Sequence, residues 1–134
     1  MGLINFKASL AAVMMVASTG PALSADVHAV RSLPGYQCMV LAKLWDGEGP
    51  QPPAVHVFAG PSSSAPQVGI AGGSIIVSSP LHVVDGRANM LFADGRSVWI
   101  STNDIAPFRV VGNPHATCTP VLLSNGRYGF QTNH

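Results

Sequence analysis

Serines and histidines are the residues of this sequence whose types could support nucleophilic catalysis. Three consecutive serines at positions 62–64 would supply a nucleophile, and His56 or His82 would supply a general base. Asp85 would orient that base. No serine lies in a G-x-S-x-G turn, which exposes the nucleophile of many hydrolases, and a serine cluster after a Gly-Pro pair is typical of a loop. The sequence therefore predicts no enzyme and no catalytic residue.

Metal and phosphate sites are not indicated either. The five histidines form no H-x-H or H-x-x-H unit and the two cysteines form no C-x-x-C unit, which are spacings typical of metal ligands. The glycine-rich run at 69–73 lacks the lysine of a phosphate-binding loop. The six acidic residues give no preferred pair for glycosidic cleavage. We therefore expect no metal ion and no other cofactor.

Large aromatic side chains are the best candidates for a recognition surface. Phe58, Trp99 and Tyr128 offer wide contact area at small entropic cost. Three arginines follow directly on an Asp-Gly or Asn-Gly pair: Arg87, Arg96 and Arg127. They would bring cations to one rim, although a solvated arginine is also a common start for a hairpin strand. Phe58, Trp99, Tyr128 and Arg96 are the predicted ligand-binding residues.

The positioning of Trp99 depends on its neighbours. It lies between Val98 and Ile100, and strand alternation places those two on one face and Trp99 on the other. Trp99 then either lines a groove or packs under the segment that a disulfide fastens, and packing is favoured.

Residues 1–25 have the composition and order of a secretory signal peptide. Lys7 is the only charged residue before Asp26, and an apolar run at 8–17 is followed by polar and helix-breaking residues. Cleavage is expected between Ala22 and Asp26. The sequence therefore predicts an exported protein, either periplasmic or secreted.

The charges of residues 26–134 cancel, because six basic side chains are balanced by six acidic ones. A chain without net charge has no long-range attraction for nucleic acid or for an anionic membrane surface. No second long apolar stretch follows the signal peptide. We therefore expect neither a nucleic-acid partner nor a membrane span.

Cys38 and Cys118 are expected to form a disulfide, because export leads to a compartment where disulfides persist. The bridge would close a loop of 80 residues. In the chain-entropy model it would stabilise the fold by about 4.5 kcal/mol. The alternative is a pair of buried free thiols.

Short β-branched runs separated by turn residues follow Ala54, a pattern typical of a small all-β barrel or sandwich. Asp-Gly and Asn-Gly pairs between several of these runs favour tight hairpins. Residues 36–45 predict a strand or a short helix, with the strand favoured, and residues 26–36 show no period and predict a loose arm. The expected strands span 54–58, 68–70, 74–78, 81–84, 87–92 and 96–100, and a further hairpin joins 121–123 to 128–130.

The chain divides into four segments on this reading. Residues 1–25 are the signal peptide, and residues 26–53 hold the arm, the first strand and an exposed loop with three prolines. Residues 54–108 form the barrel. Residues 109–134 form a C-terminal extension with a hairpin, which the disulfide fastens back to Cys38.

Three pieces of sequence between Val55 and Pro107 occur in the order of a known domain. V-H-V-F-A-G-P-S-S-S-A-P-Q-V-G-I at 55–70 is similar to a first strand, a Pro-Ser turn and a short second strand. Residues 73–77 are similar to a glycine-led strand. A hairpin, a Trp-bearing strand and a terminal 3₁₀ turn are matched by residues 94–107, D-G-R-S-V-W-I-S-T-N-D-I-A-P. Together they resemble the bacterial SH3 domain. The resemblance implies an all-β, small SH3-like barrel with N- and C-terminal extensions joined by one disulfide.

The resemblance also implies a binding function, because bacterial SH3 domains usually bind peptides or wall components. We therefore expect a non-catalytic exported module of the cell envelope that recognises peptidoglycan, an extended peptide or a partner protein. The family's terminal turn often supplies an aromatic side chain to a peptide groove, and the comparable position here is Asp104. The alternative is a structural accessory docked permanently on another envelope protein, and a small wall or peptide hydrolase is the least favoured interpretation.

Overall fold

The structure is a computed structural model that describes residues 26–133. Its regular elements are eleven β-strands and one 3₁₀ turn, and no α-helix occurs in this range. The predicted all-β class is therefore confirmed, whereas the predicted signal peptide lies outside the described residues. The elements are β1 Ala29–Ser32, β2 Tyr36–Leu41, β3 His56–Phe58, β4 Gln67–Ile70, β5 Ser74–Ser78, β6 Val83–Val84, β7 Arg87–Leu91, β8 Ser97–Ser101, η3 Thr102–Asp104, β9 Ile105–Pro107, β10 Thr117–Leu123 and β11 Tyr128–Asn133.

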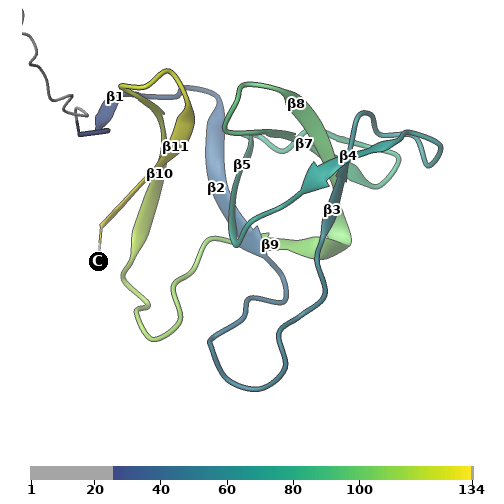
Figure 1. Ribbon diagram of the computed structural model, residues 1–134, viewed down its shortest axis with the longest axis horizontal. Coiled ribbons are helices and arrows are strands. Elements are labelled where there is room, and N and C mark those ends of the chain that lie inside the picture. The colour runs from purple at the N-terminus through teal and green to yellow at the C-terminus, as the bar shows by residue number, and fades with distance from the viewer. Residues whose placement is uncertain (1–25, 134) are drawn as a thin grey trace, which may run out of the picture.

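The larger of two antiparallel sheets contains most of the strands. Its order is β4-β3-β8-β7-β5-β2-β9, and β6 pairs with β7 beside this path. Figure 1 shows that the sheet curves strongly instead of lying flat. Its two end strands, β4 and β9, do not pair with each other, so the described strands form an open sheet and not a closed barrel. Both end strands are short, and Pro107 in β9 has no N–H to donate to a further strand.

The N-terminal segment was expected to be a loose arm over residues 26–36. This expectation is wrong for Ala29–Ser32, which form the strand β1. Residues of β1 pair with β10, with Ala29 opposite Leu123 and Ser32 opposite Val121. The pairing was not visible in the sequence because β1 is largely exposed and carries no apolar alternation. The next segment, β2, is a strand as favoured, and it lies between β5 and β9 in the larger sheet.

The main core cluster lies on one face of the larger sheet and follows strand alternation in β7 and β8. In β8, Val98 and Ile100 are buried and Trp99 is on the opposite face, as the sequence predicts. In β7, Ala88 and Met90 alternate in the same way. These residues form one cluster with buried side chains of β3, β5 and the segment after β4: Val57, Ala71, Ile75 and Val77.

The predicted tight turns are present. Asp85 and Gly86 both have positive φ, at 51° and 79°, which suits the turn that joins β6 to β7. In the turn before β8, the Asp94 carboxylate accepts a hydrogen bond from the backbone N–H of Arg96 at 3.1 Å. The turn before β11 repeats this arrangement with an asparagine. These local bonds fix the start of each following strand.

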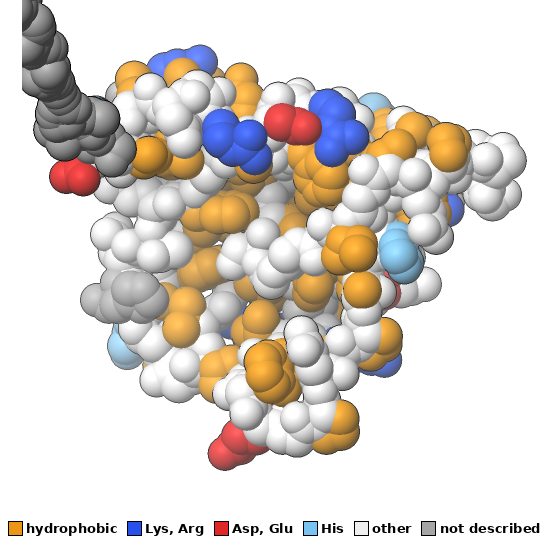
Figure 2. Space-filling view, viewed as in Figure 1, with side chains coloured by type: hydrophobic (Ala, Val, Ile, Leu, Met, Phe, Trp, Pro, Cys, Tyr) orange, Lys and Arg blue, Asp and Glu red, His pale blue; other side chains and the backbone are white. Residues whose placement is uncertain are grey.

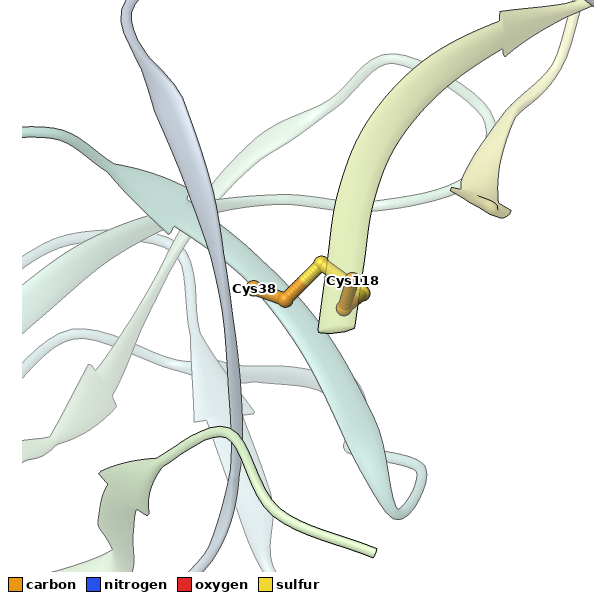
Figure 3. The surroundings of a disulfide bond; sticks show 2 residues. All are labelled: Cys38 and Cys118. Carbon is orange, nitrogen blue, oxygen red and sulfur yellow. A yellow bond between two sulfur atoms is a disulfide. The ribbon is translucent and has the colours of Figure 1, made fainter. Parts of the chain in front are cut away.

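A smaller sheet, β1-β10-β11, lies beside the larger one (Figure 1). The disulfide between Cys38 of β2 and Cys118 of β10 joins the two sheets, with the two Cα atoms 6.0 Å apart (Figure 3). The backbone N–H of Leu33 also donates to the carbonyl of Pro120 at 3.0 Å. The predicted disulfide is confirmed, and it fastens the C-terminal hairpin to β2, which neighbours the edge strand β9 of the larger sheet.

Gly69 in β4 allows one close contact of the core to form. A Cβ at this position would lie 2.7 Å and 2.8 Å from two ring carbons of Phe92, and Phe92 packs against the core. We expect Gly69→Ala to lower the free energy of unfolding by about 1–3 kcal/mol through overpacking, as measured by urea denaturation. The control is Gly72→Ala, whose Cβ would meet only a backbone oxygen at 4.0 Å. Equal stability of the two variants would contradict this packing.

Candidate functional site

A groove with a volume of about 1520 Å³ lies on the described structure. It is lined by parts of the chain that are far apart in sequence. These are the β2–β3 connection, β3 and the turn after it, the segment after β4, the β6–β7 turn and η3. A hollow of this size exceeds the volume of most small-molecule pockets, so it suits a chain-like ligand.

Aromatic and proline side chains give the groove an apolar surface. Trp45 lies in the β2–β3 connection with 47% of its surface exposed, and its indole N–H donates to the carbonyl of Gly49 at 3.4 Å. Phe58 is partly buried and lies at the end of β3. Three prolines complete this surface: Pro52, Pro53 and Pro61. Half-exposed aromatic rings beside prolines are typical of surfaces that bind extended chains.

Arg87 holds one wall of the groove in place. Its guanidinium carbon lies 3.7 Å from the centre of the Phe58 ring, which is a cation–π contact. Its Nη1 donates to the carbonyls of Gly60 and Ser62, at 3.1 Å and 2.6 Å. Arg87 therefore fixes the turn after β3 against β7 and orients the Phe58 ring. The alternative of a merely solvated arginine does not describe this residue.

Charged groups stand at the margins of the groove. Asp85 and Asp104 both line it, and Lys43 lines it from the β2–β3 connection. Asp104 belongs to η3, whose N-cap is Ser101, and the Ser101 hydroxyl accepts from the N–H of Asn103 at 3.3 Å. The cap fixes the turn that carries Asp104. The groove therefore combines an apolar surface with charges of both signs.

The four predicted ligand-binding residues do not converge on one surface. Phe58 lines the groove, whereas Tyr128 and Arg96 line a second, smaller hollow. Trp99 is half-buried and lines neither hollow. It lies opposite Phe58 across the β3–β8 pair, and its ring meets that of His82 edge-on at 5.5 Å.

Trp45 and Arg87 are the groove residues that sequence reasoning missed or undervalued. Trp45 is the last residue of the strand that the sequence predicts over 36–45. In the structure β2 ends at Leu41, so Trp45 lies in the connection to β3. A signal was present, because Trp45 stands directly before a run with three prolines and two glycines, which places it on an exposed loop. No local pattern indicates the contact between Arg87 and Phe58, which are 29 positions apart.

Ser62 and Ser63 of the serine cluster line the groove, and the hydrogen bonds of the Ser62 and Ser64 hydroxyls are local. The Ser62 and Ser64 hydroxyls are 2.9 Å apart, and the Ser62 hydroxyl accepts from the Ser64 N–H at 3.2 Å. Within residues 26–133, no histidine side chain is hydrogen-bonded to a serine hydroxyl. Likewise, no group of three or more His, Cys, Asp or Glu side chains there is placed to hold a metal ion.

Comparisons with known proteins give no assignment. No family model, no curated protein and no solved structure matches this chain. Over the described residues, the structure contains no helix with the length and apolar character needed to cross a membrane.

Proposed function

We propose that this chain is a non-catalytic, exported, SH3-like binding module of the cell envelope, and that its groove holds the extended peptide chains of the cell wall. The observation that carries the proposal is the groove itself, which is lined by half-exposed Trp45 and by Phe58, whose ring is held by Arg87. Such a surface offers flat apolar contacts to alternate side chains of an extended ligand. Charges of both signs at its margins suit a ligand that is itself zwitterionic.

The order of the strands supports the SH3-like part of the proposal. The short strands β5, β7 and β8 are neighbours in the sheet, and the Trp-bearing β8 leads through η3 into β9. The last strand, β9, returns to pair with β2. The resemblance at residues 94–107 implies this succession of hairpin, strand and 3₁₀ turn. A disulfide that closes 80 residues supports export, because such bonds persist in oxidising compartments.

Trp45→Ala tests the groove directly. Retention on purified sacculi after a salt wash is the measurement, and we expect the variant to bind about tenfold more weakly, as is typical when an aromatic anchor is removed. Trp99→Phe is the control, because Trp99 lies outside the groove, and it should bind like the wild type. Equal retention of Trp45→Ala and wild type would contradict the proposed site.

Two other outcomes would favour the competing functions. A stoichiometric partner protein recovered from envelope extract, without binding to sacculi, would support the docked accessory. Release of soluble fragments from sacculi would support a hydrolase, provided that Ser64→Ala or His56→Ala abolishes it. The proposal predicts neither result.

A further inference from the structure

A second hollow of about 300 Å³ lies where the two sheets meet. It is lined by β5, by β7 and the turn after it, by the end of β4 and by β11. The backbone N–H of Tyr128 in β11 donates to the carbonyl of Ala93 at 2.9 Å, which holds β11 against the turn. The walls of the hollow therefore come from both sheets, which are linked by the disulfide, and the Tyr128–Ala93 hydrogen bond holds β11 against the turn after β7. The volume is at the lower end for binding pockets and suits one or two residues of a peptide.

The charges at this hollow leave one positive charge without a balancing anion. Arg96, Arg127 and Asp94 all line it. The Asp94 carboxylate forms an ion pair with Arg96, with Nε and Oδ2 2.8 Å apart. The backbone N–H of Arg96 lowers the pKa of Asp94, as do the Arg96 and Arg127 guanidinium charges. Asp94 is therefore ionised at neutral pH, and the hollow is lined by two guanidinium groups but by a single carboxylate, which pairs with Arg96.

Apolar side chains line part of the hollow. The Arg96 guanidinium lies 5.0 Å from the centre of the Phe92 ring. Ile70 and Phe130 also line the hollow, with 59% and 37% of their surfaces exposed. On the face shown in Figure 2, hydrophobic side chains gather in the hollowed middle, and basic and acidic side chains stand side by side along its upper edge. Apolar side chains beside two arginines suit a ligand with an apolar group and an anionic group.

The outer edge of β11 has no described strand partner at Phe130, which lines the hollow. In the order β1-β10-β11, no described strand pairs with the outer edge of β11. The N–H of Tyr128 points away from β10, because it donates to Ala93. Phe130 lies two residues further along β11, opposite Pro120, which has no N–H to donate. Backbone groups two residues apart on a strand point in the same direction. The N–H and C=O of Phe130 therefore also point away from β10. An extended peptide can hydrogen-bond to such an edge.

We propose that this second hollow binds the C-terminal end of an extended peptide. The terminal carboxylate lies between Arg127 and Arg96, the last apolar side chain lies on Ile70 and Phe92, and the peptide backbone runs along Phe130. One carboxylate balances the one surplus positive charge, and both guanidinium groups offer donors to it. The site is separate from the groove that contains Trp45, and the inference does not depend on the proposed function.

Solution NMR with defined tetrapeptides tests this inference. The probe is N-acetyl-Ala-Phe-Ala-Leu with a free carboxylate, titrated to about 10 mM so that a Kd of ~1 mM is measurable. We expect saturable shifts of the Ile70, Phe92 and Phe130 amides. The same peptide with a C-terminal amide should bind about tenfold more weakly, because a charge-assisted pair is lost.

Variants locate the carboxylate. Arg127→Gln should weaken binding of the acid about tenfold and leave binding of the amide unchanged. Arg31→Gln is the control, because Arg31 lies on β1 outside this hollow. Equal affinities of wild type for acid and amide, or no saturable shift at these residues, would overturn the inference. Shifts confined to the residues around Trp45 would also overturn it while supporting a ligand in the groove.

Discussion

Loss of the Cys38–Cys118 disulfide is expected to lower the free energy of unfolding by about 2–5 kcal/mol. The bond joins β2 of the larger sheet to β10 of the smaller one, across 80 residues. Without it the unfolded chain gains conformational freedom, and the smaller sheet keeps few links to the larger one. We expect urea denaturation of Cys38→Ser/Cys118→Ser to show the decrease.

The same variant should lose stability unevenly. Hydrogen exchange is expected to rise more in β1, β10 and β11 than in β7 and β8, because the latter pair belongs to the core of the larger sheet. Wild-type protein treated with a reductant is the matched control and should behave like the double variant. A decrease below about 1 kcal/mol, or uniform exchange across both sheets, would contradict the stabilising role given to this bond.

Ile100→Ala is expected to lower the free energy of unfolding by about 2–5 kcal/mol. Ile100 is 0% exposed and packs in the cluster that β3, β5, β7 and β8 share. Truncation removes buried methyl groups and leaves a cavity that the strands close only in part. Thermal and urea denaturation should both report the loss.

Ile70→Ala provides the matched control, because Ile70 is the same residue type but is 59% exposed. Its truncation is expected to change stability by less than about 0.5 kcal/mol. If both variants lost equal stability, the face assigned to the core would be wrong. If neither lost stability, the side chains between these strands would not form a packed core.

The strands after Ala54 could be predicted from sequence because alternation and turn residues agree there. Val98 and Ile100 on one face and Trp99 on the other follow from a period of two. Asp85-Gly86 follows from the positive φ that this turn needs. The two signals are local, so neighbouring residues suffice to determine them.

The remaining features depend on contacts between distant segments. β1 forms because β10 offers it an edge, although its own residues are mostly exposed. Phe58 and Tyr128 line different hollows, because the disulfide and the Tyr128–Ala93 bond place β11 beside the β7–β8 turn. The cation–π contact between Arg87 and Phe58 likewise forms only because the fold brings β3 and β7 near each other. No pattern in a single segment carries this information.

Trp45 fluorescence offers the most direct test of the groove, because the chain has only two tryptophans. In Trp99→Phe, Trp45 is the single reporter, and peptide fragments released from sacculi are the titrant. Covering an indole that is 47% exposed should shift its emission to shorter wavelength in a saturable way. The companion variant Trp45→Phe, which reports from Trp99, should show no shift. Bound fragments with unchanged Trp45 emission, or a response from Trp99 alone, would contradict the assignment of the groove as the binding site.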